Sequence, residues 1–210
     1  MKTQAVITGD IINFTRLTAT KRQQLIMATE ALLKTWTAEK ENAEIFRGDS
    51  YQILFNDVSE ALIKSIQLIC WFKQHSEKKN NVDLGTRISV GIGAISYQGK
   101  NVLNSDGEAF HLSGRNFDKM KDEEYLSIHT AEEEKNAGIK IILSFINKYI
   151  EKWTTAQAEV IFMHLEGKNQ QETAKTLSLS QPSVNSRLKS AGWKEIESAI
   201  KYITYLVQEK

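Results

Sequence analysis

The hydrophobic and polar positions of this chain follow different periods in its first and second parts. In the first part, short β-branched and apolar runs alternate with segments whose apolar positions recur every three or four residues. The runs predict strands over residues 2–8, 43–47, 51–55, 86–95 and 126–129, and the segments predict helices over residues 21–40, 58–76 and 108–121. The βαββαβ order, followed by one more helix and strand, predicts a ferredoxin-like α+β domain whose antiparallel sheet carries helices on one face.

From residue 132 onward only helical periodicity remains. It predicts helices over residues 132–152, 155–166, 170–177, 181–189 and 193–207. We therefore expect an α+β domain over residues 1–131, a rigid connecting helix over residues 132–152 and an all-α domain over residues 153–210.

The last predicted helix carries a regular apolar stripe. Its members are three or four positions apart: Trp193, Ile196, Ile200, Ile203 and Val207. A stripe of this kind either packs on its own domain or, if exposed, forms a coiled-coil interface between two copies. We expect a homodimer, because a second copy would also supply a second DNA-reading unit.

Composition narrows the choice of partners and compartment. The 210 residues have a formal net charge of +1, so any contact with DNA must come from a local patch. The single cysteine, Cys70, excludes an internal disulfide and lies in an apolar run, which favours a core position. The N-terminus lacks a signal-peptide pattern, and no apolar run reaches the length of a membrane span. We expect a cytoplasmic protein with no membrane partner.

Two aspartates lie where predicted strands give way to turns. Asp10 follows the first apolar run, and Asp49 lies between the two strands of a predicted hairpin. Two carboxylates brought together by a sheet can hold Mg²⁺ or Mn²⁺ against a nucleotide triphosphate, because these cations prefer oxygen ligands. A simpler alternative is that Asp10 caps a helix and Asp49 turns the hairpin.

Four blocks resemble class III nucleotidyl cyclases and occur in the same order. Residues 10–15 (Asp-Ile-Ile-Asn-Phe-Thr) resemble the first metal motif, and Gly48-Asp49 resembles the second. Residues 87–93 resemble the core strand that follows, where Gly91 and Gly93 suggest a close approach to the backbone. A late helix with Gly107, His111 and Arg115 at four-residue spacing is similar to the fourth block.

The resemblance implies roles for individual residues. Asp10, Asp49 and the backbone of Ile11 would hold the metal, and Arg115 with His111 would act on the transferring phosphate. Nucleotide contacts are expected from the segment after Asp10 and from the late helix: Ile12, Asn13, Phe14, Thr15, Asn104 and Gly107. If a helix begins at this turn, the amides after Asp10 could also cradle phosphate oxygens.

Three positions depart from the cyclase pattern. His111 replaces the asparagine that acts in the transition state, while Ile45 and Asn104 occupy the two base-selecting positions. The Ile45 side chain cannot hydrogen-bond a purine. The sequence therefore favours binding of a nucleotide or metal-phosphate ligand over catalytic turnover.

Residues 170–189 resemble the helix-turn-helix of LuxR-type and sigma-factor-type regulators. Ala174 lies where the two helices meet, Leu179 lies in the turn, and Val184 and Leu188 complete the apolar contact. Ser180 can cap the second helix, with Pro182 in its first turn. The candidate DNA contacts on this helix are Gln181, Ser183, Asn185, Ser186, Arg187 and Lys189.

The layout of both parts together resembles the SatD-like family. We expect a DNA-binding regulator whose cyclase-like domain senses a nucleotide or metal-phosphate ligand. One alternative is an active cyclase or nucleotidyl transferase that uses Mg²⁺ or Mn²⁺ with Asp10, Asp49 and Arg115. Another is an interaction module whose two domains only assemble partners.

Overall fold

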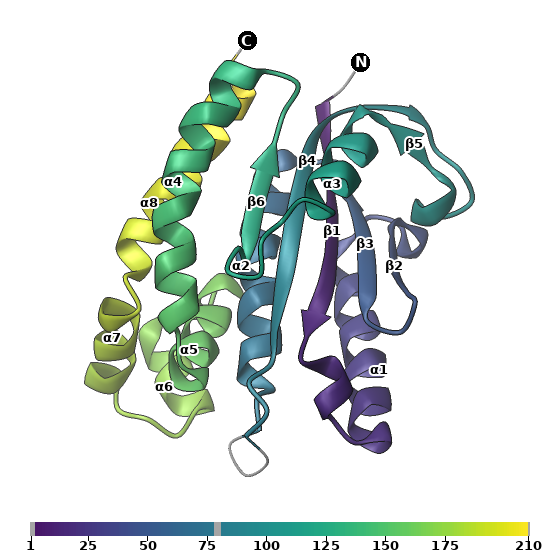
Figure 1. The fold of residues 1–210 in the computed structure, drawn as a ribbon. Coiled ribbons are helices and arrows are strands. Elements are labelled where there is room, and N and C mark those ends of the chain that lie inside the picture. Colours follow the sequence, from purple (N-terminus) through teal and green to yellow (C-terminus); the bar gives the residue numbers. More distant parts are fainter. Residues whose placement is uncertain (1–2, 78–80, 210) are drawn as a thin grey trace.

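The computed structural model describes residues 3–77 and 81–209 and has a mixed α+β architecture built around a curled sheet (Figure 1). Its strands are β1 (Thr3–Ile12), β2 (Ala43–Phe46), β3 (Ser50–Phe55), β4 (Gly85–Tyr97), β5 (Asp106–Gly107) and β6 (Leu126–His129). The sheet order is β2-β3-β1-β4-β5 with antiparallel neighbours, and β6 pairs with β4 in parallel.

The helices lie close to their expected ranges. They are α1 (Ala19–Trp36), α2 (Val58–Gln74), α3 (Glu108–Phe117), α4 (Glu133–Lys152), α5 (Thr155–Leu165), α6 (Gln170–Thr176), α7 (Gln181–Ser190) and α8 (Trp193–Gln208). Short 3-10 turns among the described residues include η1 (Phe14–Arg16), η2 (Lys40–Asn42) and η4 (Val102–Asn104). The periodicity of apolar residues thus predicted these helices to within a few residues of their ends.

Helices cover both faces of the sheet, which corrects the expectation of helices on one face. Ala5 and Ile7 of β1 belong to the large hydrophobic cluster that includes residues of α1 and α2. Val6 points the other way, into a smaller cluster with Ala109 and Phe110 of α3. Because successive strand residues face opposite sides, β1 is buried between the two layers.

Gly91 explains how α3 comes so close to β4. A Cβ built at Gly91 would lie 2.1 Å from the carbonyl oxygen of Ala109 and 2.4 Å from the backbone nitrogen of Ser113, both on α3. Gly93 similarly lies under the side chain of Glu108. The sequence-based expectation of close backbone approach at these glycines is confirmed.

The helical second part packs directly on the first part through α2. Trp71 of α2 lies beside Phe162 of α5, with ring centroids 5.7 Å apart, and donates its indole N–H to Thr29 of α1 over 3.0 Å. One hydrophobic cluster runs continuously from Ala5 of β1 to Ile203 of α8. The expected boundary near residue 131 therefore separates two patterns of secondary structure but not two hydrophobic cores.

The apolar stripe of α8 is part of this shared core. Its first four members, Trp193, Ile196, Ile200 and Ile203, are buried, and Val207 is partly buried against the same cluster. The alternative in which this stripe packs on its own chain is confirmed. Cys70 is also fully buried, and burial raises the pKa of its thiol.

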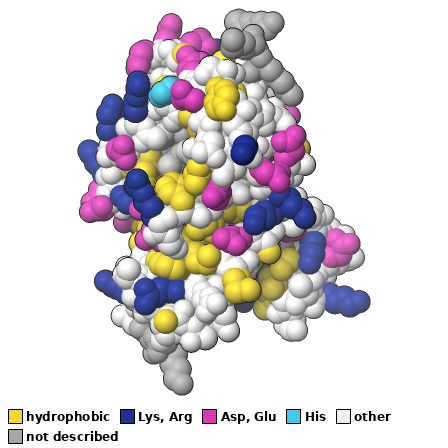
Figure 2. Space-filling model, turned by 90° about the vertical axis from the view of Figure 1, so that its right-hand side faces the viewer, with side chains coloured by type: hydrophobic (Ala, Val, Ile, Leu, Met, Phe, Trp, Pro, Cys, Tyr) yellow, Lys and Arg dark blue, Asp and Glu magenta, His cyan; other side chains and the backbone are white. Residues whose placement is uncertain are grey.

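Figure 2 shows the face that carries the β2 edge of the sheet and α1. Lys and Arg side chains are interspersed with Asp and Glu, and hydrophobic side chains line its hollowed middle. In the part of the chain that the structure describes, none of the helices is both long and apolar enough to span a bilayer.

We expect Gly91→Ala to lower the free energy of unfolding by about 1–3 kcal/mol, because α3 must move away from β4 to admit the methyl group. Gly114→Ala on α3 is the matched control, since a Cβ there meets nothing within 4 Å. The control should be neutral or stabilising by up to about 1 kcal/mol. Urea unfolding measures both, and equal stability of the two variants would contradict the close contact.

Candidate ligand and DNA-binding sites

Asp10 lies inside β1, not after it. It pairs with Ser50 of β3 on one side and with Arg87 of β4 on the other, and the ladder with β4 continues to Ile12. The predicted strand end at Thr8 was therefore wrong, because the β-branched residues after Asp10 extend the pairing. The helix-capping alternative for Asp10 was also wrong: α1 begins at Ala19 and is capped by Thr18.

Both carboxylate oxygens of Asp10 accept hydrogen bonds from Arg87. The Nε atom donates to Oδ1 over 3.2 Å, and a terminal nitrogen donates to Oδ2 over 2.6 Å. The two side chains are only 24% and 26% exposed. This bidentate geometry is the strong form of an arginine–carboxylate pair. Sequence reasoning missed the pair, because only the register between β1 and β4 places the two residues opposite each other.

The surroundings of Arg87 hold its charge in place. Its guanidinium lies 5.5 Å from the centre of the Phe117 ring and 3.8 Å from a carboxylate oxygen of Asp122. Hydrogen bonding to Asp10 raises the pKa of Arg87 above its usual value. Arg87 thus stays charged beside Asp10, where the sequence led us to expect a metal ion.

A buried polar chain fixes the backbone at Asp10. The Tyr51 hydroxyl bonds to the Thr86 hydroxyl, which donates to the backbone carbonyl of Asp10. Burial raises the pKa of Tyr51, so its hydroxyl stays protonated. Gly9 makes room for the phenol, because a Cβ there would lie 2.5 Å from Tyr51 ring and hydroxyl atoms.

Asp49 lies in the turn that links β2 to β3. Arg47 and Gly48 have φ angles of 55° and 90°, which allow the tight reversal. The Asp49 carbonyl accepts a hydrogen bond of 3.0 Å from the backbone of Ile11. The sheet therefore brings the backbone of Asp49 next to that of Ile11, and the hairpin-turn role of Asp49 is confirmed. Metal binding by the two carboxylates stays a prediction.

No larger metal cluster supports the pair. Across residues 3–77 and 81–209, no group of three or more His, Cys, Asp or Glu side chains could hold a metal ion. A metal at Asp10 and Asp49 would therefore need oxygen atoms from its nucleotide or from water to complete its coordination.

The residues after Asp10 lead into the short 3-10 turn η1 and not into an α-helix. Asn13 has a φ angle of 61° and donates its side-chain amide to the Asp83 carbonyl over 2.7 Å. Phe14 is buried in the core, Ile12 is partly buried and Thr15 is exposed. Because α1 begins only at Ala19, the α-helix start on which the expected phosphate cradle depended is not present at this turn.

The predicted catalytic residues of α3 point away from Asp10. Ser113 faces the sheet and accepts a hydrogen bond of 3.1 Å from Thr8 of β1. Arg115, two positions later, lies on the far side of the helix, is exposed and pairs with no other described residue. His111 is also exposed and lies 3.0 Å from Asp106. Within one chain, the structure does not bring Arg115 to Asp10.

The other two predicted nucleotide contacts on this side serve the local fold. Gly107 has a φ angle of 153°, and a Cβ there would lie 2.6 Å from the Ala94 carbonyl oxygen. Asn104 is exposed at the end of η4, where its backbone bonds to Asn101. Gly107 is therefore required by packing, whether or not a ligand binds.

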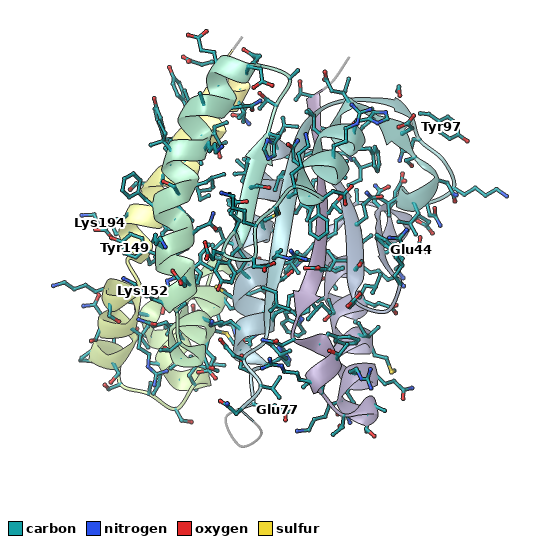
Figure 3. The ribbon with its side chains drawn as sticks, in the orientation of Figure 1. Glu44, Glu77, Tyr97, Tyr149, Lys152 and Lys194 are labelled. Carbon is teal, nitrogen blue, oxygen red and sulfur yellow. The ribbon has the colours of Figure 1, made fainter. Side chains whose placement is uncertain are left out.

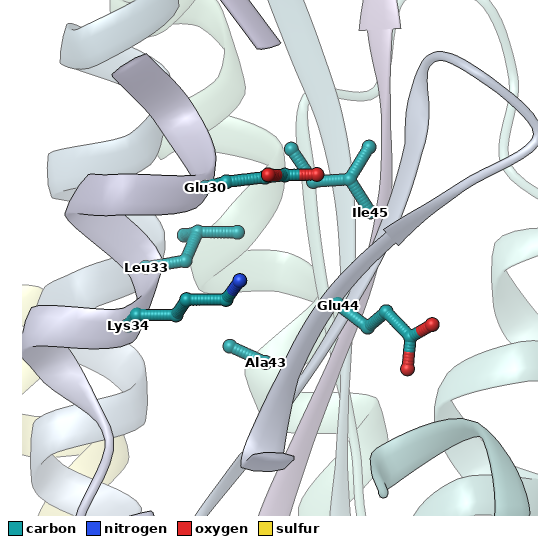
Figure 4. A pocket seen from close by; sticks show the side chains of 6 residues that line it. All are labelled: Glu30, Leu33, Lys34, Ala43, Glu44 and Ile45. Carbon is teal, nitrogen blue, oxygen red and sulfur yellow. The ribbon is translucent and has the colours of Figure 1, made fainter. Parts of the chain in front are cut away.

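Ile45, at the expected base-selecting position, faces the opposite side of the sheet from Asp10. It pairs with Tyr51, whereas Asp10 pairs with Ser50, and neighbouring residues on a strand point to opposite faces. Ile45 lines a small pocket between α1 and β2, together with Leu33 and Lys34 (Figure 4). The cavity of about 30 Å³ is far too small for a nucleobase.

Sequence reasoning also missed a polar row beside Asp10. On the α3 side of the sheet, Gln52 donates to the Thr8 hydroxyl over 3.2 Å, and Thr8 donates to Ser113 over 3.1 Å. The fully buried Ser89 pairs with Thr8 in the ladder between β1 and β4, and its hydroxyl has no hydrogen-bond partner among the described residues. These residues provide donors and acceptors next to the Asp10–Arg87 pair.

The second candidate site is the outer face of α7. Ser180 caps the helix by accepting from the backbone of Ser183, and Pro182 lies in the first turn. Val184 and Leu188 are buried against the neighbouring helices, as predicted. The predicted DNA contacts that are exposed are Gln181, Asn185, Ser186 and Lys189.

Two of the predicted DNA contacts have partners within the chain. Arg187 lies against α5, where it donates to the Ala156 carbonyl over 3.4 Å and lies 3.8 Å from the Glu159 carboxylate. The Ser183 hydroxyl lies 2.8 Å from that of Ser180. Arg187 therefore joins α7 to α5, and the side chains that are free to reach a groove are the four exposed ones.

Comparison of the chain with protein-family models, curated proteins and solved structures gives no match in any of the three.

We expect Asp10→Asn and Arg87→Gln each to lower the free energy of unfolding by about 1–3 kcal/mol, because each leaves a poorly solvated partner without its charge-assisted bonds. The double variant should lose less free energy of unfolding than the sum of the two single losses, because the two residues interact with each other. Urea unfolding of all four proteins measures the coupling.

The exposed Glu197–Lys201 pair on α8 is the control, at 3.2 Å with side chains 39% and 73% exposed. Its coupling should stay below about 0.5 kcal/mol. Equal coupling in the two pairs would contradict a special role for Asp10 and Arg87.

Proposed function

We propose that this protein is a DNA-binding transcription regulator whose α+β part senses a nucleotide or metal-phosphate ligand. The observation that carries the proposal is the outer face of α7. It presents Gln181, Asn185, Ser186 and Lys189 to solvent while Val184 and Leu188 hold the helix on its neighbours.

The arrangement of α5, α6 and α7 supports a helix-turn-helix reader. Asn169 caps α6 and Ser180 caps α7, so the start of each helix is defined by side-chain bonds. Between them, the Leu179 amide bonds to the Ala174 carbonyl over 2.8 Å. Such a pair of helices can place the second helix in a major groove, where amide side chains read base edges and lysine meets phosphate.

The first part supports ligand sensing more than turnover. The sheet order β2-β3-β1-β4, with the metal-motif segments on neighbouring strands, is compatible with a cyclase-like, ferredoxin-like domain. Arg87 already neutralises Asp10, and Arg115 lies on the outer side of α3. A ligand that carries its own cation would compete with Arg87 for the Asp10 carboxylate. Its binding would then shift the protein toward a state in which the Asp10–Arg87 pair is broken.

We expect Asn185→Ala to weaken binding to a selected DNA fragment by about 1–3 kcal/mol, because an amide that reads a base edge is lost. Lys189→Ala should weaken binding to all DNA sequences alike. It should also reduce the slope of the logarithm of the binding constant against the logarithm of the salt concentration by about 1. Fluorescence anisotropy with genomic fragments at several salt concentrations measures both effects.

Lys201→Ala is the matched control, since Lys201 is an exposed lysine on α8, away from α7. Its DNA affinity should equal that of the unchanged protein. If Asn185→Ala and Lys189→Ala bind as Lys201→Ala does, α7 is not the reading helix.

We expect a thermal shift when the protein meets Mg²⁺ or Mn²⁺ together with a nucleoside triphosphate, and Asp10→Asn and Asp49→Asn should abolish it. Asp118→Asn, exposed at the end of α3, is the control and should keep the shift. A shift that survives both Asn variants would remove the carboxylates from the site. A cyclised product, lost in the same two variants, would establish the enzyme alternative.

A further inference from the structure

Helix α4 carries an exposed apolar stripe that its own fold leaves uncovered. Ile141, Phe145 and Tyr149 are 63%, 67% and 41% exposed. They are four positions apart and therefore lie on one face of the helix. The opposite face of α4 is buried, through Ile139, Leu143, Ile146 and Ile150. We call the three exposed residues the α4 outer stripe.

Helix α8 extends this exposed surface. It runs antiparallel to α4, because Lys135 near the start of α4 bonds to the carbonyl of Glu209, after the end of α8, over 2.7 Å. At the other end, Tyr149 lies over Gly192, where a Cβ would be 2.4 Å from its ring. Figure 1 shows the two helices side by side along one side of the molecule, and Figure 3 shows Tyr149, Lys152 and Lys194 on this side.

Charges of opposite sign lie at the two ends of the stripe. Glu134 precedes it and Lys152 follows it, and both are exposed. Neither forms an ion pair with another residue of the described chain, although neighbouring charges such as Lys148 and Glu151 do. The helix dipole favours an acid at the start of a helix and a base at its end, which accounts for their sign. It does not account for their alignment with the apolar stripe.

The spacing of these residues is symmetric about Leu143. Ile141 and Phe145 are each two positions from it, and Glu134 and Lys152 are each nine positions from it. A two-fold axis beside Leu143 would therefore place Ile141 against Phe145 of a second copy and Glu134 against Lys152 of that copy. An interface between two identical copies must be self-complementary in this way.

We propose that a second copy of this chain packs on the α4 outer stripe, with the two α4 helices antiparallel and the two-fold axis beside Leu143. Two apolar contacts then form at the centre, and two ion pairs form at the ends. Exposed Ala137 and Gly138 leave room opposite Tyr149 and Lys148, and a Cβ at Gly138 meets nothing within 4 Å. The mixture of charges fits a second copy better than an anionic membrane, which favours lysine and arginine alone.

This dimer would also set the spacing of the two reading helices, a consequence that rests on the proposed function. Trp153, directly after α4, donates to the carbonyl of Ala191 at the end of α7 over 2.8 Å. The two α7 helices would therefore lie beyond opposite ends of the α4 pair. At 1.5 Å per residue, the two Lys152 positions are about 27 Å apart along the axis. The two α7 helices would lie farther apart than these two positions, at a separation close to the spacing of about 34 Å between successive major grooves.

Analytical ultracentrifugation of the full chain without DNA tests the dimer. The unchanged protein should sediment at twice its chain mass of 23.9 kDa, and Phe145→Glu should be a monomer. Met27→Glu, on α1 and 63% exposed, is the control and should remain dimeric. A wild-type monomer at every concentration, or a Phe145→Glu dimer as tight as the control, overturns the proposal.

Charge reversal tests the antiparallel register. Glu134→Lys and Lys152→Glu should each weaken the dimer by roughly three- to tenfold, since each creates two like-charge contacts. The double variant restores opposite charges and should return to the wild-type affinity. A double variant weaker than either single variant contradicts the register. The dimer is measured without DNA, so its test is independent of the proposed function. If the protein forms this dimer but binds no DNA, the proposed function is rejected and the interface is retained.

Discussion

The middle of helix α2 is covered on every side, and much of the structure follows from that constraint. Its residues from Ser65 to Cys70 are all buried and occupy the whole circumference of the helix, so neither the sheet nor the second part alone could shield them. The sheet and α1 cover one side, while α5 and α8 cover the other. Cys70, Trp71 and Phe72 lie in this region, and Gln67 bonds to Glu166 near the end of α5. The two halves of the chain are therefore joined by a common core.

The Asp10–Arg87 pair determines which ligands the candidate site can accept. A partly buried carboxylate without a partner is costly, so the fold supplies a cation from the next strand. The same bidentate bonds occupy the oxygens that Asp10 would offer to a metal ion. A metal must therefore first displace the Arg87 guanidinium, which also lies over Phe117 and beside Asp122. An arrangement of this kind suits a site that responds to a competing cation better than one that turns over substrate continuously.

Local patterns predicted the elements well, and long-range relations much less well. The pattern of apolar residues predicted α4 and β6 almost to the residue, because their apolar residues recur on the face that the fold buries. The continuation of β1 through Asp10, the pairing with Arg87 and the orientation of Ile45 all depend on strand register. Register is decided by contacts between distant segments, which a single sequence does not display. The helix α7 was foreseen, but the attachment of Arg187 to α5 was not.

A contiguous set of bonds connects the candidate ligand site to α4, the helix of the proposed dimer face. Ile88, next to Arg87, bonds to the Tyr125 carbonyl before β6, and Asn147 of α4 bonds to the backbones of Tyr125 and Leu126. Such contacts alone do not couple two sites. Coupling requires an element that has two arrangements and whose equilibrium between them is shifted by binding at either site. Arg87 offers such an element, because Asp122 is a second acceptor already 3.8 Å away. A cation on Asp10 would favour the Asp122 arrangement, and β6, which pairs with β4, lies between that change and the helix that carries the stripe.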